Sequence, residues 1–250
     1  MTGPRNQGYV HEVFRSIQGE GLYVGAMQIF ARLSGCSFCC DYCDTRGAAV
    51  RTEECALRGI DGDTRIANPV DPAELAAFVT SLAGSTPGIH SLSVTGGEPL
   101  EQPGFLEIFL VHVRAAGLPV YLETNGLLEE PAARIAPLAD VVSMDIKLPS
   151  LCGGTDTFRI YSKVLPVFGA RELFCKVVIS ADMKYEEFTE AVDLLASYDR
   201  MVPMVIQPVT PGCGCERAGA ALIERCYIDA ARRLIKVRVI PQCHTVMGLR

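Results

Sequence analysis

The stretch Gly35-Cys-Ser-Phe-Cys-Cys-Asp-Tyr-Cys-Asp-Thr45 follows an apolar segment typical of a β-strand and contains four of the chain's eleven cysteines. These four can be grouped as two adjacent C-x2-C pairs or as one C-x3-C-x2-C triplet. A four-cysteine zinc site usually separates its two pairs by about 12 to 20 residues, so that the second pair can complete a tetrahedron. No residue separates the pairs here, and this spacing favours the triplet.

The triplet consists of Cys36, Cys40 and Cys43. The adjacent side chains of Cys39 and Cys40 tend to point in different directions, so we expect that Cys39 is not a ligand. Three thiolates on a four-iron cubane leave one iron without a protein ligand, and this open position lets a small molecule bind the metal directly. A closed electron-transfer cluster, which uses four cysteines, fits the spacing less well. A buried group of structural thiols is the alternative without a metal.

The composition is that of a globular protein, with 49% hydrophobic residues and a length that suits one large domain or two small ones. No apolar run approaches the roughly 20 residues of a membrane span, and no signal-peptide core is found at the N-terminus, so we expect a cytoplasmic protein without a membrane partner. A net charge of −6 without a long Lys/Arg run argues against nucleic acid as a partner. The odd cysteine count indicates thiol or metal chemistry in a reducing compartment.

Strands and helices are predicted to alternate along the chain. At Asp71–Ala83 an N-cap aspartate and a proline at the first helical position precede apolar residues at helical spacing, which predicts a helix. Further helices are expected at Phe105–Ala116, Pro131–Leu138, Thr157–Phe168, Tyr185–Ser197 and Ala218–Leu234. Strands are expected at Tyr9–Ser16, Met27–Leu33, His90–Thr95, Pro119–Thr124, Val141–Ile146, Leu173–Ser180, Met201–Gln207 and Val237–Ile240.

This alternation implies right-handed βαβ units and a parallel sheet. Roughly six parallel strands suit an α/β fold with an incomplete, partial TIM-type β/α barrel, formed as a single domain over residues 1–250. Residues 46–69 are polar and show no clear period, so we expect an insertion or a flexible crossover there. In such folds the chemistry gathers at the C-terminal ends of the strands. Six candidate motifs do follow predicted strands: Gln18–Glu20, the cysteine loop, Thr95–Pro99, Glu123–Asn125, Asp145–Lys147 and Gln207–Thr210.

The turn Gly96-Gly-Glu-Pro99 is by itself only a tight turn. Together with the cysteine triplet, it resembles the motif of radical S-adenosylmethionine (SAM) enzymes that binds the ammonium group of SAM. In that superfamily a 4Fe-4S cluster binds the amino and carboxylate groups of SAM at its open iron. The reduced cluster then cleaves SAM to a 5′-deoxyadenosyl radical.

A more specific resemblance covers most of the chain. It is carried by Gln18-Gly-Glu-Gly21, Arg32, Cys43-Asp-Thr45, Thr95-Gly-Gly-Glu-Pro99, Glu123-Thr-Asn-Gly126, Asp145-Ile-Lys147, Gln207-Pro208 and Pro241-Gln-Cys-His244. On these motifs the chain is similar to the 7-carboxy-7-deazaguanine synthases, a radical SAM family of the pathway to queuosine and other deazapurine nucleosides. The family consists of small dimers with an incomplete barrel.

The resemblance implies a carbon–nitrogen lyase that converts 6-carboxy-5,6,7,8-tetrahydropterin to 7-carboxy-7-deazaguanine with loss of ammonia. The implied cofactors are the 4Fe-4S cluster, SAM and Mg²⁺. Hydrogen abstraction from C6 of the pterin by the adenosyl radical would precede a Mg²⁺-assisted ring contraction, so the chemistry is carried by cluster and SAM rather than by a catalytic side chain. The implied partners are the pterin, an external electron donor such as a flavodoxin or ferredoxin, and a second copy of the chain.

Site residues follow from the matching positions. The resemblance implies that Thr45 is a magnesium ligand. The amide of Gln18 and the carboxylate of Glu20 would complement the edge of an aminopyrimidinone, and Arg32 would pair with a substrate carboxylate. The substrate-binding positions are Ile17, Gln18, Gly19, Glu20, Arg32, Thr95 and His244. The SAM-binding positions are Tyr42, Cys43, Asp44, Gly97, Glu98, Asp145, Ile146, Lys147, Gln207, Pro208, Val209 and Thr210.

Some residues depart from the family pattern. Thr245 stands where a basic residue is common, and Cys39, Cys213 and Cys215 match no motif, so a second metal site of Cys213, Cys215 and Cys226 is an alternative use of those thiols. Two other functions stay open at this point. One is a glycyl-radical-enzyme activase, and the other is a zinc-bound structural module with Cys36, Cys39, Cys40 and Cys43 as ligands. Metal content distinguishes them, since a cluster carries about four irons per chain and the module one zinc.

Overall fold

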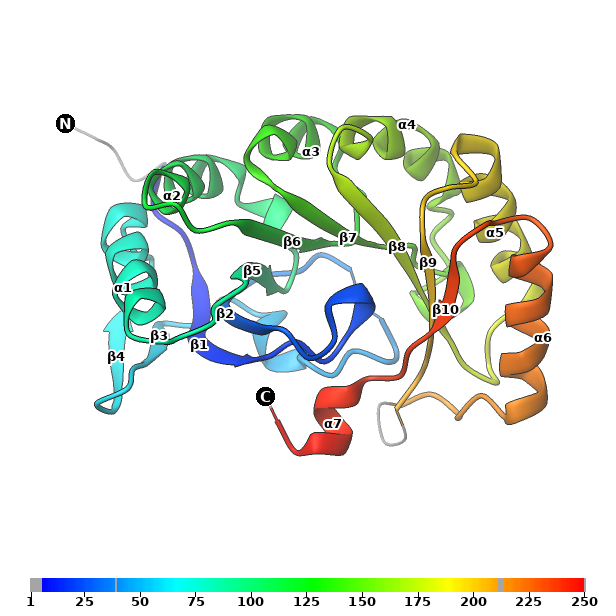
Figure 1. Cartoon of the computed structure of the whole chain (residues 1–250), viewed down its shortest axis with the longest axis horizontal. Helices are drawn as coiled ribbons and strands as arrows, with labels where there is room; N and C mark the ends of the chain where they lie inside the picture. Colours follow the sequence, from blue (N-terminus) through cyan, green and yellow to red (C-terminus); the bar gives the residue numbers. More distant parts are fainter. Residues whose placement is uncertain (1–5, 39, 211–213, 250) are drawn as a thin grey trace.

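A computed structural model describes residues 6–38, 40–210 and 214–249 of the chain. Its strands are β1 (Val10–Ile17), β2 (Met27–Leu33), β3 (Glu54–Arg58), β4 (Asp63–Ala67), β5 (Ser91–Gly96), β6 (Val120–Thr124), β7 (Val141–Asp145), β8 (Glu172–Ile179), β9 (Met204–Pro208) and β10 (Val237–Val239). They form one sheet in the order β10-β9-β8-β7-β6-β5-β2-β1-β3-β4. The sheet curves into an open barrel, as the alternating elements predicted (Figure 1).

Strand direction divides the sheet into two parts. From β2 through β5 to β10 every neighbouring pair is parallel, which gives seven parallel strands in the described residues instead of the roughly six expected. On the other side, β1 runs antiparallel to β2 and carries the hairpin of β3 and β4 at its outer edge. The parallel part brings the C-terminal ends of its strands to one side of the barrel.

The helices cover the outer face of the sheet. They are α1 (Pro72–Gly84), α2 (Pro103–Ala115), α3 (Glu129–Ile135), α4 (Phe158–Phe168), α5 (Tyr185–Tyr198), α6 (Ala220–Ala231) and α7 (Cys243–Met247), with 3₁₀ turns η2 (Gly21–Tyr23), η3 (Arg46–Ala48), η4 (Pro99–Glu101), η5 (Ala136–Leu138) and η6 (Pro149–Leu151). Helices α1 to α6 follow the convex side, whereas α7 lies at the open side of the barrel (Figure 1). Within the described residues, no helix combines the length and the apolar character that crossing a membrane requires.

Helix α1 shows how local sequence defines these elements. The carboxylate of Asp71 accepts hydrogen bonds from the backbone N–H groups of Ala73 (2.8 Å) and Glu74 (3.2 Å), and Pro72 occupies the first turn. Such a cap stabilises a helix by about 1 kcal/mol. The buried positions include Leu75 and Val79, four residues apart, which turn one face of the helix toward the sheet.

The segment 46–69 contains secondary structure that the sequence did not predict. After η3, strands β3 and β4 form an antiparallel hairpin that extends the sheet beyond β1. Strand β4 is mostly exposed, so it lacks the alternation of apolar residues on which strand prediction depends. Arg58 of β3 forms ion pairs with Glu12 of β1 (3.1 Å) and Asp63 of β4 (2.6 Å), which stabilise the hairpin against β1. That this segment is an insertion stays a prediction.

Candidate active site

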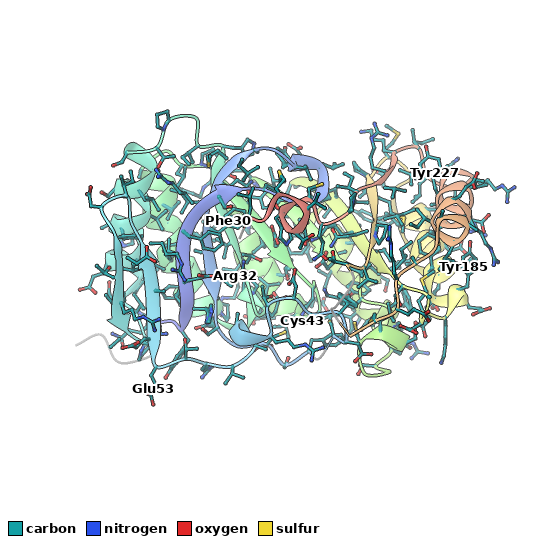
Figure 2. The ribbon with its side chains drawn as sticks, turned by 90° about the horizontal axis from the view of Figure 1, so that it is seen from below. Phe30, Arg32, Cys43, Glu53, Tyr185 and Tyr227 are labelled. Carbon is teal, nitrogen blue, oxygen red and sulfur yellow. The ribbon has the colours of Figure 1, made fainter. Side chains whose placement is uncertain are left out.

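One pocket of about 560 Å³ lies at the C-terminal ends of the parallel strands. Arg32 of β2 and Cys43 of the following loop lie on the same side of the molecule as the short C-terminal helix α7 (Figure 2). Most predicted site residues line this pocket: Ile17, Gln18, Gly19, Glu20, Arg32, Cys36, Cys40, Tyr42, Cys43, Asp44, Thr45, Thr95, Gly97, Glu98, Asp145, Lys147, Gln207, Val209 and His244.

Three predicted SAM positions do not line the pocket. Ile146 is buried in the core at 1% exposure, and Pro208 forms the last residue of β9. Thr210 donates its hydroxyl hydrogen bond to the side-chain oxygen of Gln242 and so contacts the C-terminal tail. Their side chains therefore support neighbouring segments rather than forming the pocket wall.

The thiols of Cys36, Cys40 and Cys43 are free and face the same pocket. Burial raises the pKa of Cys36 to about 11, whereas a hydrogen bond from Cys152, whose Sγ lies 3.2 Å from that of Cys40, lowers the pKa of Cys40 to about 6. The thiolate is the form that binds metal, and a bound iron ion deprotonates a coordinating thiol outright. This donor set, three free thiols on one loop, fits a 4Fe-4S cluster with an open iron.

Two further predictions concerned Cys39 and a second metal site of Cys213, Cys215 and Cys226. Cys39 and Cys213 lie outside the described residues, so the prediction that Cys39 is not a ligand stays untested. Cys215 is partly buried and Cys226 fully buried in the core around α6. No metal-binding group that includes either of them is found in the part of the chain that the structure describes.

The Gly96–Pro99 turn locks the cysteine loop in position. The N–H of Gly97 donates to the carbonyl of Leu33 (2.9 Å), and the N–H of Glu98 donates to the carbonyl of Gly35 (2.8 Å). The carboxylate of Glu98 accepts from the Thr124 hydroxyl (2.7 Å) and from the backbone N–H of Asn125 (2.7 Å). Burial raises the pKa of Glu98 to about 7 in spite of these donors. The side chain of Glu98 thus joins the ends of β5 and β6.

A polar wall of Gln18, Thr95 and Glu123 lines the same pocket as the cysteines. The Gln18 amide donates to Glu123 Oε1 (2.9 Å) and to Gln28 (3.0 Å), while the Thr95 hydroxyl donates to Glu123 Oε2 (3.1 Å). Burial raises the pKa of Glu123 above its ordinary value. The sequence motif contained Glu123, but no site role was assigned to it. The structure places this carboxylate between the two predicted substrate residues Gln18 and Thr95.

Arg32 and Glu12 face each other across the β1–β2 pair. Arg32 Nε lies 3.3 Å from Glu12 Oε1, and Arg58 Nε lies 3.1 Å from Glu12 Oε2. Arg32 also lies over the ring of Phe14. Glu12 is shared by Arg32 and Arg58, and its contact with Arg32 involves only one of the five N–H donors of that guanidinium group. Arg32 therefore keeps the capacity to bind an anion in the pocket.

The end of β7 carries a second charged group. Lys147 Nζ lies 3.1 Å from Asp145 Oδ2 and 5.3 Å from the centre of the Tyr42 ring. Burial by itself would lower the pKa of Lys147, but Asp145 and Tyr42 keep it well above the ordinary value. The hydroxyl of Tyr161 accepts from the backbone N–H of Lys147 (2.8 Å) and donates to the carbonyl of Asp145 (3.1 Å), which fixes this turn.

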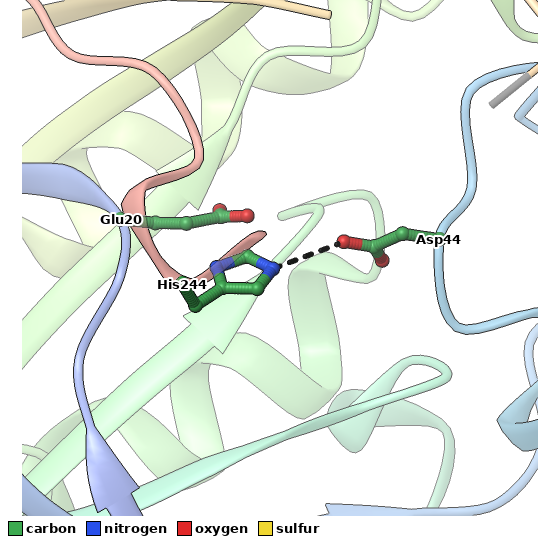
Figure 3. Close-up of side chains that lie close together, drawn as sticks. All are labelled: Glu20, Asp44 and His244. Carbon is green, nitrogen blue, oxygen red and sulfur yellow. Dashed lines mark ion pairs between the residues drawn. The ribbon is translucent and has the colours of Figure 1, made fainter. Parts of the chain in front are cut away.

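The C-terminal tail closes the pocket from the open side. Gln242 Nε2 donates to Glu20 Oε1 (3.0 Å) and to Asp44 Oδ2 (2.8 Å), and His244 Nε2 lies 3.7 Å from Asp44 Oδ2 (Figure 3). Gly19 permits this approach, because a Cβ atom at that position would lie 2.5 Å from the His244 side chain. The tail thereby joins the β1–β2 turn to the cysteine loop.

Glu20, Asp44 and His244 offer three ligand atoms within 4.8 Å of one another (Figure 3). The contact with Asp44 raises the pKa of His244. Burial would raise the pKa of Asp44, but the contact with His244 lowers it below its usual range. The Gln242 amide already donates to both carboxylates, so these three side chains are stabilised by protein groups.

Lys176 is a pocket residue that the sequence analysis missed. It interrupts the apolar run Leu-Phe-Cys-Lys-Val-Val-Ile of β8, and its side chain is only 4% exposed. Its ammonium donates to Glu20 and lies 3.3 Å from Asp145 Oδ1. A lysine inside an otherwise buried strand was the signal that could have identified it.

Comparisons with known proteins show which family the chain resembles. Residues 32–151 match the family model described as the radical SAM superfamily. The chain is 37% identical to a 7-carboxy-7-deazaguanine synthase of Geobacter sulfurreducens and 35% identical to one of Methanothermobacter thermautotrophicus, in both cases over 96% of each chain. The crystal structure of QueE from Escherichia coli shares the fold, with a TM-score of 0.64, 22% identity and 95% of each chain covered.

Proposed function

The chain belongs to the 7-carboxy-7-deazaguanine synthase family of radical SAM enzymes, and we propose that it converts 6-carboxy-5,6,7,8-tetrahydropterin to 7-carboxy-7-deazaguanine with release of ammonia. The observation that carries this proposal is the shared pocket. The three free thiols of one loop face the same 560 Å³ space as the polar wall of Gln18, Thr95 and Glu123. Both reactants can thus be held next to each other.

Cys36, Cys40 and Cys43 would hold the 4Fe-4S cluster. When bound and reduced, the cluster supplies the electron that generates a radical from SAM. Lys147 would bind the carboxylate of SAM, because Asp145 favours its charged form and its side chain is only 13% exposed. The side chains of Tyr42 and Val209 would form apolar parts of the SAM wall, since both line the pocket.

The pterin would bind against the polar wall. Glu123 Oε1 accepts hydrogen bonds from Gln18 and Ser93, whereas Oε2 accepts from Thr95 and retains a lone pair for an N–H donor of the aminopyrimidinone ring. Glu20 and the neighbouring backbone of Gly19 border the same space. Arg32 would bind the substrate carboxylate, because its side chain lines the pocket and is 15% exposed.

Thr45 would contribute one oxygen ligand to Mg²⁺. Its hydroxyl oxygen lies 3.9 Å from Cys43 Sγ and faces the pocket next to Asp44. A single protein ligand suits Mg²⁺, which usually retains several waters and binds substrate oxygens. His244 and Gln242 would cover this group and limit access of bulk water, because the tail lies at the open side of the barrel.

A flavodoxin- or ferredoxin-type electron donor, a homodimeric assembly and a cytoplasmic location stay predictions. The glycyl-radical-enzyme activase and the zinc-bound module are set aside, since the family of the chain is known. The proposal therefore concerns a small-molecule substrate.

The test is an anaerobic reaction of reconstituted protein with SAM, a reductant, Mg²⁺ and 6-carboxytetrahydropterin, followed by mass spectrometry. We expect 7-carboxy-7-deazaguanine to form only when SAM is present. The matched control is the Cys40→Ala variant under the same conditions, which should give no product. If 5′-deoxyadenosine accumulates without this product, the radical chemistry stands and the pterin is the wrong substrate.

A further inference from the structure

We propose that Lys176 is a positioning residue: a fixed, buried cation that holds Glu20 on the substrate side of the pocket and Asp145 on the SAM side, and so couples the two binding sites. This inference rests on the proposed function, which places the pterin near Glu20 and SAM near Asp145. Lys176 itself would touch neither molecule.

The geometry gives Lys176 two partners from separate elements. Its ammonium donates to Glu20 in the β1–β2 turn and lies 3.3 Å from Asp145 Oδ1 at the end of β7. Asp145 and Lys176 are also paired in the register of β7 and β8, so the backbone sets the distance between them. Asp145 Oδ1 has no hydrogen-bond partner in the described residues and depends on this ion pair.

The other oxygens of these carboxylates face different groups. Glu20 Oε1 accepts from Gln242 of the tail, and Asp145 Oδ2 contacts Lys147 at 3.1 Å. Lys176 therefore links Glu20, which contacts Gln242 of the tail, to Asp145, which contacts Lys147. A shift of its ammonium would move both carboxylates.

Charge explains why a cation is needed at this point. The carboxylates of Glu20, Asp145 and Glu123 lie around Lys176, and an unpaired buried carboxylate there would be costly. Burial alone would lower the pKa of Lys176, but the three carboxylates raise it well above the ordinary value. The three carboxylates thus favour the charged form of Lys176.

Two variants and one control test the inference in cluster-containing protein. Lys176→Met keeps the length but removes the charge, whereas Lys176→Arg keeps the charge. Lys163→Met on the exposed face of α4 is the matched control. Binding is measured with 6-carboxypterin, a fluorescent oxidised analogue of the substrate, and separately with SAM. If Lys176→Met does not fold by circular dichroism, Lys176→Gln takes its place.

We expect Lys176→Met to weaken the binding of both 6-carboxypterin and SAM at least tenfold, which is about 1.4 kcal/mol for each. Lys176→Arg should bind both more tightly than Lys176→Met, and Lys163→Met should match the unchanged protein within threefold. Equal binding by Lys176→Met and the unchanged protein overturns the inference. So does a loss for one ligand only, because the coupling role requires both.

A double-mutant cycle separates positioning from a general effect on folding. If Lys176 acts on the pterin through Glu20, adding Lys176→Met to Glu20→Gln should weaken 6-carboxypterin binding by less than threefold. A further tenfold loss would mean that the two residues act independently, and the inference would be wrong. Failure of the unchanged protein to bind 6-carboxypterin at all is a different result, because it contradicts the proposed substrate.

Discussion

Gly97 provides a sharp test of how the Gly96–Pro99 turn supports the cysteine loop. In Gly97→Ala the new Cβ atom would lie 1.9 Å from the carbonyl oxygen of Gly35, the residue before the first cluster cysteine, and 3.1 Å from that of Ala48. Real Cβ atoms essentially never approach closer than 3.0 Å, so Gly35 would have to move by about 1.1 Å. Both contacts are to backbone, which cannot rotate away as a side chain does.

The expected effect has a structural and a catalytic part. Overpacking of this kind costs about 1–3 kcal/mol, and for a chain of this size each kcal/mol lowers Tm by roughly 2–4 °C. A displacement of about 1 Å between reacting groups can lower the rate about 100-fold, or about 2.7 kcal/mol of activation free energy. We expect Gly97→Ala to show both losses, together with a reduced iron content.

The assays are thermal unfolding by circular dichroism, iron determination after reconstitution, and kcat/KM from product formation. Gly84→Ala is the matched control, because a Cβ atom there meets nothing within 4 Å at the end of α1. This control should keep full activity and raise the stability by up to about 1 kcal/mol. If Gly97→Ala unfolds at the Tm of the unchanged protein and retains kcat/KM within threefold, the packing argument is wrong.

Three further predictions follow from the pocket. Glu123→Gln keeps the shape of the wall but removes its charge. Because hydrogen bonds to charged groups contribute about 1.5–3 kcal/mol, 6-carboxypterin binding should weaken about tenfold. Unchanged affinity in a fluorescence titration would exclude Glu123 from the substrate wall. The pKa of His244 is raised by Asp44, so their contact stabilises the protein fully below about pH 6.5 and is lost as pH rises through the raised value. The Tm difference between the unchanged protein and His244→Gln should therefore be small, largest in mild acid where His244 is protonated and Asp44 is still ionised, and absent in base. A difference that does not vary with pH would contradict this. Cys40→Ala should lose the reducible cluster while Cys39→Ala retains it, as measured by iron content and electron paramagnetic resonance; equal loss in both would refute the ligand choice.

Local features of the sequence predicted most elements of the fold. The cap at Asp71, the apolar spacing of α1 and the strand before the cysteine loop depend on residues close in the chain, and the structure confirms them. The hairpin of β3 and β4 was not predicted, because β4 is mostly exposed and lacks an alternating apolar pattern. Strand β3 is ordered by pairing with β1, and β4 by pairing with β3, rather than by their own sequence patterns.

Site residues that belong to short sequence motifs were predictable, whereas those that depend on contacts between distant parts of the chain were not. The cysteine loop could be recognised from its spacing, and the Gly96–Pro99 turn from its resemblance, together with that loop, to a family motif. Lys176 and Gln242 meet Glu20 across separations of 156 and 222 residues, and no local pattern reports such a meeting. Glu123 lay inside a recognised motif, but its hydrogen bonds to Gln18 and Thr95 appear only in the folded chain.

We infer that one pocket holds the cluster, SAM and the pterin together. The most direct test is an anaerobic crystal structure of the reconstituted protein with SAM and 6-carboxypterin. We predict a cluster on Cys36, Cys40 and Cys43, SAM beside Lys147, and the pterin ring hydrogen-bonded to the wall that contains Glu123. A pterin bound outside this pocket, or a cluster held by a different set of cysteines, would contradict the account.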